Sequence, residues 1–218
     1  MKTVIRADGG YIPMPVWSYC MKVLSKIDGL GIMTVCKPSD KKKSVISLYE
    51  QQIHALDLVK ADYAFSAETD VLYHPSRFIF EPLEDDLFYY QCNLYELTPY
   101  GFWKHPRGHG YCQMVANCQT WKENLKARIS ALQAGWRMGW AEPGLADPPE
   151  IQTGKVRISK YYSEFPDVSI RHGGNISGSR DPGRNGRTIE MYVSDIPYWG
   201  NYKTLLEKME IAPAEGGV

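Results

Sequence analysis

The first third of the chain alternates short apolar runs with helical patterns, and this order limits the folds that the sequence can adopt. Apolar side chains three or four residues apart predict helices over Val16–Ile27 and Ile46–Leu56, with Ser44 as a cap of the second. Short apolar runs predict strands at Thr3–Arg6, Ile32–Cys36 and Tyr63–Ala67. This strand–helix–strand–helix–strand order is typical of α/β proteins with crossover helices. We therefore expect a mostly parallel, twisted sheet flanked by helices.

The second half of the chain is less regular and shows neither a repeat nor a linker. Apolar patterns predict further strands at Leu87–Gln91, Val156–Ser159 and Val168–Arg171, and helices at Trp121–Leu132 and Tyr202–Met209. At 218 residues, one domain is the expected number. We expect residues 1–211 to form this domain and residues 212–218 to be a frayed tail.

Composition and charge exclude several classes of protein. The chain holds 25 Lys and Arg against 25 Asp and Glu, so it lacks the positive charge of a general nucleic-acid coat protein. No run of about 18 apolar residues is present, which argues against a membrane span, and Met1–Gly10 lacks the apolar stretch of a signal peptide. The five cysteines are unpaired in spacing, as in a reducing compartment. We expect a cytoplasmic protein, in the host cytoplasm if the source is viral.

Charge is nevertheless unevenly distributed along the chain. Residues 60–100 hold eight acids and two bases, whereas residues 155–187 hold seven bases and three acids. Facing acidic and basic segments can hold a cation and phosphate groups, as a metal–nucleotide site requires. Two solvated faces that neutralise each other would give the same distribution. Charge alone therefore favours the simpler interpretation of solvated faces.

An acidic triplet makes the metal–nucleotide interpretation stronger. Glu68 and Asp70 follow directly on the apolar run Tyr63–Ala67, so they lie at the carboxyl end of a predicted strand. In open α/β sheets, ligands bind at this edge. Two carboxylates at positions i and i+2 of a turning backbone can share one hard cation and leave its other positions to water and phosphate oxygens.

Three segments together resemble a known family. The segment Tyr63–Phe78, which reads YAFSAETDVLYHPSRF, resembles the metal-binding segment of small bacterial and viral glycosyltransferases with the GT-A fold. Val168–Ser177, which reads VSIRHGGNIS, is similar to the Ile-Arg-His-Gly-x-Asn segment of that group, and Pro197–Gly200 is similar to its Tyr-Trp-Gly. The segments occur in the order that the family has. The resemblance implies a single GT-A-like domain.

The resemblance also implies an activity, a cofactor and site residues. The protein would transfer a sugar from a nucleotide diphosphate sugar, with UDP favoured, to a hydroxyl group, assisted by Mn²⁺ or Mg²⁺. Asp70 and His172 would bind the metal, and Glu68 would be a further ligand or would contact the ribose or sugar. The diphosphate would be bound by Arg171, Arg180 and Arg184. Asp8 stands where such enzymes often carry an acid that contacts the nucleotide.

Two carboxylates are candidates for the catalytic base that an inverting transferase needs. Glu142 lies in a turn between Trp140 and Pro143, and this stretch resembles the Glu-Pro-Gly of the family. Neighbouring tryptophans suit both sugar stacking and a raised carboxyl pKa. A structural turn with core tryptophans is an equal alternative for Glu142. Glu96 is the second candidate.

Other interpretations remain open. His105, His109, Cys112 and Cys118 lie close together, but their spacings of 4, 3 and 6 are unlike those of structural zinc sites. A sugar-1-phosphate nucleotidyltransferase would share the fold, yet Ala7–Gly10 has too little of the glycine-rich phosphate loop of that class. A noncatalytic carbohydrate- or nucleic-acid-binding module would leave Asp70 and His172 without a role. The acceptor would be a glycan or a hydroxymethylated DNA base.

Overall fold

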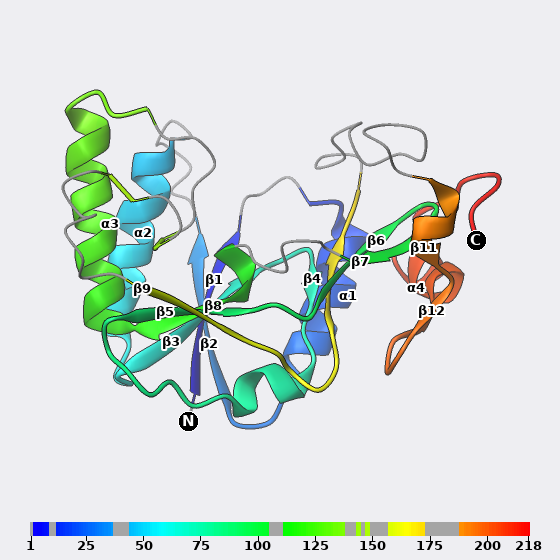
Figure 1. The fold of residues 1–218 in the computed structure, drawn as a ribbon, viewed down its shortest axis with the longest axis horizontal. Helices are drawn as coiled ribbons and strands as arrows, with labels where there is room; N and C mark the ends of the chain where they lie inside the picture. The colour runs from blue at the N-terminus through cyan, green and yellow to red at the C-terminus, as the bar shows by residue number, and fades with distance from the viewer. Residues whose placement is uncertain are drawn as a thin grey trace.

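The chain folds as a mixed α/β structure (Figure 1). The computed structural model describes residues 2–8, 12–36, 44–104, 111–137, 143–144, 147–148, 157–172 and 188–218. The helices of this part of the chain are α1 (Met14–Leu24), α2 (Val45–Leu58), α3 (Cys118–Gln133) and α4 (Tyr202–Lys208). Short 3₁₀ helices are η1 (Pro75–Ile79), η2 (Tyr111–Gln113) and η3 (Ile189–Met191).

The first sheet begins with the three predicted parallel strands, and the strand that follows them in the sheet is antiparallel. Its strands, in spatial order, are β2 (Leu30–Cys36), β1 (Lys2–Asp8), β3 (Tyr63–Glu68), β8 (Met114–Asn117), β5 (Leu87–Gln91) and β9 (Arg157–Tyr161). β1 pairs in parallel with β2 and β3, whereas β8 is antiparallel to both β3 and β5. The expected parallel arrangement holds for β1, β2 and β3 and again for β5 with β9, and the antiparallel strand β8 between these groups makes the whole sheet mixed.

A second sheet lies beside the first and carries half of the candidate site. Its strands, in spatial order, are β11 (Tyr192–Val193), β7 (Gly101–Lys104), β6 (Leu94–Thr98), β10 (Asp167–Ile170) and β4 (Val71–Leu72). β10 runs parallel to β6 and antiparallel to β4. A short hairpin of β12 (Asp195–Ile196) and β13 (Gly200–Asn201) follows. β4 links the two sheets in sequence because it comes directly after the end of β3.

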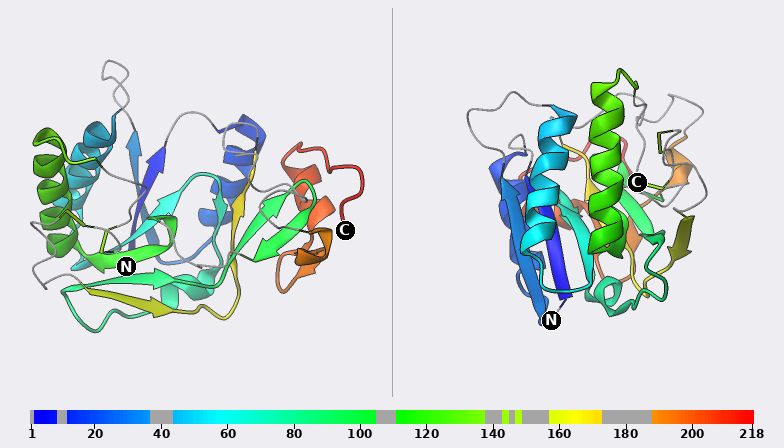
Figure 2. Two further views of the ribbon diagram at one scale, coloured as in Figure 1. Left: turned by 45° about the horizontal axis from the view of Figure 1, so that its top comes forward. Right: turned by 90° about the vertical axis from the view of Figure 1, so that its left-hand side faces the viewer.

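Helices cover the first sheet because its strands are apolar on both faces. Val4 and Ile5 are both fully buried, and as neighbours on β1 they point into different hydrophobic clusters. The cluster that contains Ile5 includes Trp121 and Leu125 of α3, which lies beside α2 (Figure 2). α2 begins at the predicted cap, where the Ser44 hydroxyl accepts a hydrogen bond from the Ser47 N–H at 3.0 Å.

The second sheet is packed against α1 and α4 at the other end of the molecule (Figure 1). Val16 and Cys20 of α1 share a hydrophobic cluster with Leu72, Val168 and residues of α4. The C-terminal residues return to the turn between β6 and β7, where the Ala214 N–H donates to the Pro99 carbonyl at 2.8 Å. The Val218 N–H likewise donates to the Tyr100 carbonyl. The tail that was expected to fray is thus held at both of these points. Among the described residues, no helix is both long and apolar enough to cross a membrane.

Candidate functional site

Asp70 and His172 meet although they lie far apart in the sequence. The His172 Nε2 atom is 3.4 Å from the Asp70 Oδ2 atom. Asp70 occupies the turn between β3 and β4, and His172 lies just beyond the end of β10. The antiparallel pairing of β4 with β10 brings these positions together, and the Ile170 N–H donates to the Asp70 carbonyl at 2.8 Å. The structure therefore brings together the two residues that the resemblance assigns to one metal.

The contact between Asp70 and His172 is largely shielded from solvent. Only 3% of the His172 side chain and 15% of the Asp70 side chain are exposed. Cys20 of α1 lies near the carboxylate: burial raises the pKa of its thiol, and the charge of Asp70 raises it further. A carboxylate and an imidazole are thus held together at the edge where β3 and β10 end.

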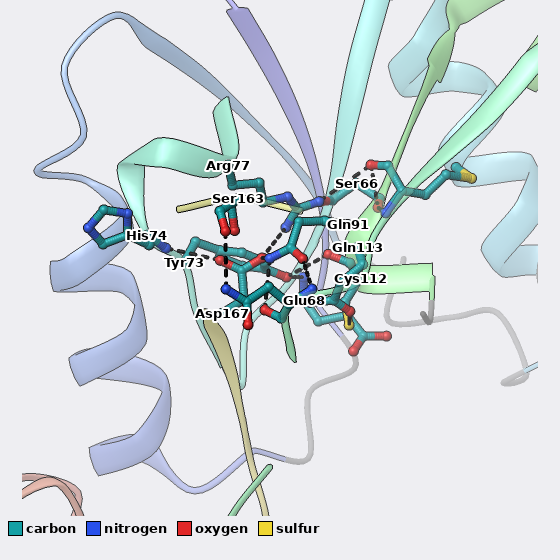
Figure 3. Close-up of polar contacts among 12 residues, drawn as sticks. Ser66, Glu68, Tyr73, His74, Arg77, Gln91, Cys112, Gln113, Ser163 and Asp167 are labelled. Atoms are coloured by element: carbon teal, nitrogen blue, oxygen red, sulfur yellow. Dashed lines mark hydrogen bonds and ion pairs between the residues drawn. The ribbon is translucent and has the colours of Figure 1, made fainter. Parts of the chain in front are cut away.

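The turn that carries Glu68 and Asp70 is fixed by a buried tyrosine (Figure 3). The Glu68 N–H donates to the Tyr73 hydroxyl at 2.8 Å, and that hydroxyl donates to the Cys112 carbonyl at 3.2 Å. Burial is the largest cause that raises the pKa of Tyr73, so its hydroxyl stays a proton donor. Tyr73 therefore ties the acidic turn to the segment that precedes β8.

A buried ion pair joins the strands that carry Asp70 and His172 (Figure 3). The Arg77 Nη1 atom is 3.7 Å from the Asp167 Oδ2 atom, and both side chains are fully buried. Arg77 also donates to the Ser66 carbonyl of β3 at 2.7 Å. Asp167 accepts from the His74 N–H at 3.0 Å and from the Gln91 amide at 3.2 Å. This network fastens β3, η1 and the start of β10 to one another.

The pKa values in this network reflect opposing causes. Burial raises the pKa of Asp167 to about 6, while the charge of Arg77 and three hydrogen bonds lower it. For Arg77, burial is the largest cause and lowers the pKa, but the charge of Asp167, together with those of Tyr161, Tyr73 and Cys112, raises it by more, so the net pKa is raised. Arg77 therefore stays a cation, and it needs its partner inside the protein.

Glu96 and Arg171 form a second ion pair, next to His172. The Glu96 Oε1 atom contacts the Arg171 Nη2 atom, and the Glu96 side chain is fully buried on β6. The Arg171 N–H also donates to the Leu97 carbonyl at 2.8 Å, and 17% of the Arg171 side chain is exposed. Glu96, predicted as a candidate base, thus lies beneath Arg171 and holds its guanidinium.

The backbone of Asp8 reaches the same edge. Ala7 is the register partner of Glu68, so Asp8 lies beside the acidic turn at the end of β1. This is the position expected for the carboxyl end of a strand parallel to β3. The side chain of Asp8 lies outside the described part.

Several predicted residues lie outside the described residues, namely Glu142, Arg180, Arg184, His105 and His109. The residues that follow Glu142 are anchored in the core. The Tyr90 hydroxyl donates to the Pro143 carbonyl at 2.5 Å, and the Gly144 N–H donates to Asp147 at 3.0 Å. Asp147 in turn pairs with the fully buried Arg128 of α3 at 2.5 Å. The segment next to Glu142 is therefore fastened to β5 and α3.

Cys112 and Cys118, the two described members of the considered zinc cluster, are buried thiols that form no disulfide. Cys118 donates to the Ala61 carbonyl at 3.3 Å, and burial raises the pKa of its thiol to about 11. Among the described residues, no group of three or more His, Cys, Asp or Glu side chains is arranged to hold a metal. Asp70 and His172 are thus a pair of protein donors in this part of the chain.

Sequence reasoning missed the supporting residues Tyr73, Arg77 and Asp167. Tyr73 and Arg77 lie inside the segment Tyr63–Phe78, and a signal was present: an arginine interrupts an otherwise apolar and polar-neutral stretch after Tyr73. Their roles depend on Asp167 and Cys112, which are distant in sequence. The sequence offered no way to pair them.

Comparisons with known proteins give structural neighbours. No family model and no curated protein matches the chain. One similar structure is a glycosyltransferase involved in the glycosylation of the major capsid of PBCV-1, with 11% identity, a TM-score of 0.48, and coverage of 74% of this chain and 82% of that chain. Another is the glycosyltransferase GlyE of Streptococcus pneumoniae TIGR4, with 12% identity, a TM-score of 0.46, and coverage of 72% and 44%.

A third neighbour is the galactosyltransferase LgtC, solved with donor and acceptor sugar analogs. It shares 12% identity at a TM-score of 0.41, and 73% of each chain is covered. The chain spans most of the first and third neighbours but less than half of GlyE. We transfer no residue role from them.

Proposed function

We propose that this protein is a metal-dependent glycosyltransferase that uses a nucleotide diphosphate sugar as its donor. The observation that carries the proposal is the distance of 3.4 Å between the Asp70 Oδ2 atom and the His172 Nε2 atom. The two residues belong to separate segments, each of which resembles a glycosyltransferase segment. They come together at the carboxyl ends of β3 and β10, where α/β proteins bind ligands.

The donor atoms present fit a divalent metal. Neighbouring ligands of an octahedral ion bound at about 2.1 Å lie about 3 Å apart, which is close to the 3.4 Å between the carboxylate oxygen and the imidazole nitrogen. Asp70 and His172 would hold the ion, and Glu68 would be a further ligand or would contact the donor. An imidazole ligand favours Mn²⁺ over Mg²⁺. A bound ion would offset the negative charge of the diphosphate leaving group.

The chain's own cations would act on the same leaving group. Arg171 is partly exposed beside His172, and Glu96 keeps its guanidinium in place. We assign Arg171, with Arg180 and Arg184, to the phosphates of the donor. Asp8, at the end of β1, would contact the nucleotide.

The proton of the acceptor hydroxyl needs a base if the enzyme inverts the anomeric centre. We assign this role to Glu142, because the residues after it are fixed by Tyr90 and by the Arg128–Asp147 pair. Glu96 is engaged with Arg171 in a fully buried position, so it serves better to orient that cation. The acceptor would be a glycan or a hydroxymethylated DNA base, and a uridine nucleotide is the favoured donor.

A thermal-shift titration with UDP, GDP, CDP and ADP, each with and without Mn²⁺, tests the proposal. A ligand at a hundred times its Kd stabilises the native state by about 2.7 kcal/mol, which corresponds to a rise in Tm of roughly 5–10 °C for a chain of this size. We expect such a shift for one nucleotide and only with Mn²⁺. Equal stability under all conditions would contradict the proposal and favour a noncatalytic binding module.

A further inference from the structure

Tyr198 adopts a backbone conformation that is unusual for an aromatic residue. Its φ angle is 70°, in the left-handed region that favours glycine and is unusual for a bulky residue. Its side chain is also exposed, with 59% of its surface open to solvent. Strained backbone at an exposed aromatic residue in the connection between β12 and β13 raises the question of what this side chain does.

Aromatic neighbours hold the ring of Tyr198 in place. The ring centroid of His74 lies 4.1 Å away and that of Trp199 lies 4.8 Å away, at interplanar angles of 85° and 88°. Phe165 lies 5.7 Å away and is tilted by 46°. None of these three rings is stacked in parallel on Tyr198. The contacts therefore hold the ring while more than half of the Tyr198 surface stays open to solvent.

The supporting rings are themselves fixed. His74 is buried, its N–H donates to Asp167 at 3.0 Å, and its Nδ1 atom is 2.7 Å from the Ser76 hydroxyl. The Trp199 indole N–H donates to the Pro166 carbonyl at 2.7 Å. Tyr198 thus packs against side chains that belong to residues hydrogen-bonded to the buried Asp167 and to the residue before β10.

We propose that the exposed ring of Tyr198, supported by the half-buried Phe165 and Trp199, is a platform on which a pyranose ring of a carbohydrate stacks. Rigid, exposed aromatic rings combine a large apolar face with little loss of side-chain freedom on binding. The hydroxyl groups of a sugar need hydrogen-bond acceptors around such a face. The fixed backbone at Tyr198 keeps its ring in one orientation before the ligand binds, so that less conformational freedom is lost on binding.

The charges beside the platform favour a neutral carbohydrate over a nucleic acid, which would also stack on aromatic rings. Glu164 is exposed, directly precedes Phe165, and its charge acts on His74. Asp195 is exposed on β12, in the hairpin that carries Tyr198. Two carboxylates would repel phosphate groups, whereas they can accept hydrogen bonds from sugar hydroxyls.

The platform is separate from the site of Asp70 and His172. Pro166, whose carbonyl accepts the Trp199 hydrogen bond, directly precedes β10, whereas His172 lies beyond the other end of this strand. At the rise of an extended strand, the five steps from Asp167 to His172 span about 16 Å. The platform would therefore bind a different part of a carbohydrate from the part that reacts, and its binding does not depend on the proposed transferase activity.

Calorimetric titration with cellohexaose, maltohexaose and chitohexaose tests the platform. We expect the protein without metal or nucleotide to bind at least one of these probes saturably. Tyr198→Asn should weaken that binding by about tenfold or more, as one lost stacking contact predicts. Asparagine tolerates a positive φ, so this variant should still fold, which circular dichroism checks. Tyr198→Phe keeps the ring and should bind within about twofold of the wild type.

Tyr162→Ala is the matched control, since Tyr162 is an exposed tyrosine without a described ring contact to the platform, and it should leave binding unchanged. Asp70→Ala should also leave it unchanged, which separates the platform from the proposed transferase site. The platform is refuted if none of the three probes binds, or if Tyr198→Asn binds as the wild type does. Tighter binding of an oligo(dT) probe than of any oligosaccharide would also overturn it.

Discussion

The carboxylate of Asp167 lies 3.7 Å from the guanidinium of Arg77, and neither side chain is exposed to solvent. Asp167→Asn removes the negative charge and leaves Arg77 as an unbalanced buried cation. We expect the free energy of unfolding to fall by about 3–5 kcal/mol, as measured by urea denaturation. The matched control is Asp57→Asn at the exposed pair with Lys122, which should cost less than about 1 kcal/mol.

The double variant Arg77→Met, Asp167→Leu removes both charges of the buried pair. We expect it to be more stable than Asp167→Asn alone, because no uncompensated charge stays inside the protein. If the single and double variants unfolded at the same urea concentration, the loss would come from packing and not from the buried charge.

Tyr73 should act on the acidic turn through its hydroxyl. Tyr73→Phe leaves the Glu68 N–H and the Cys112 carbonyl without this partner, so we expect a loss of about 1–3 kcal/mol in stability. If the turn binds the metal, turnover should fall by roughly tenfold with a weaker response to Mn²⁺.

Tyr89→Phe is the matched control for Tyr73→Phe. The Tyr89 hydroxyl also accepts backbone N–H bonds, from Leu83 and Glu84, but at a loop away from Asp70. We expect a similar loss of stability and an unchanged response to Mn²⁺. An equal loss of turnover in both variants would show that Tyr73 contributes only to stability.

Asp70 and His172 should be needed for metal-dependent turnover. We expect Asp70→Asn and His172→Ala each to lower turnover by about a hundredfold or more, and to remove the Mn²⁺-dependent shift in Tm with nucleotide. Circular dichroism checks that each variant is folded, and Asp57→Asn serves as an exposed aspartate control. Full activity in either variant would end the assignment of these residues to the metal.

Glu142 should affect the rate of transfer and not donor binding. Glu142→Gln keeps the size of the side chain but cannot accept the proton of the acceptor, so turnover should fall by about 10²–10⁴-fold. The nucleotide-induced shift in Tm should stay the same. Unchanged turnover would return Glu142 to a structural role in its Pro-Gly turn.

His74 should make stability depend on pH. Burial lowers its pKa below the 6.5 of the unfolded chain, although the charge of Glu164 acts in the opposite direction. The native state therefore binds this proton less readily than the unfolded state does. The stability that neutral His74 contributes is present above pH 6.5 and is lost as the pH falls below that value.

His74→Asn removes this titration and keeps an acceptor for the Ser76 N–H at the start of η1. Between about pH 7 and pH 5, the unfolding free energy of the variant should fall less than that of the wild type. Asp167, whose pKa burial raises to about 6, titrates in both proteins and does not affect the difference. Parallel pH profiles would contradict a lowered pKa for His74.

The local pattern of the sequence was enough to predict the elements that depend on local forces. β1, α1, β2, α2 and β3 all form within a few residues of the predicted bounds, because hydrophobic periodicity and the Ser44 cap act within one segment. Of the second sheet, only β10 was predicted, as the strand Val168–Arg171. Its strands β4 and β11 are two residues long, and such short strands form only where a neighbouring strand supplies the hydrogen bonds.

The sequence by itself determined that acids follow the third strand and that a histidine follows a later one. Only the tertiary structure decided that Asp70 and His172 touch, that Glu96 lies beneath Arg171, and that Asp167 neutralises Arg77. Each of these contacts joins residues from segments distant in the chain. Their pairing depends on strand order and register, which are set by the packing of the whole core and not by any local pattern.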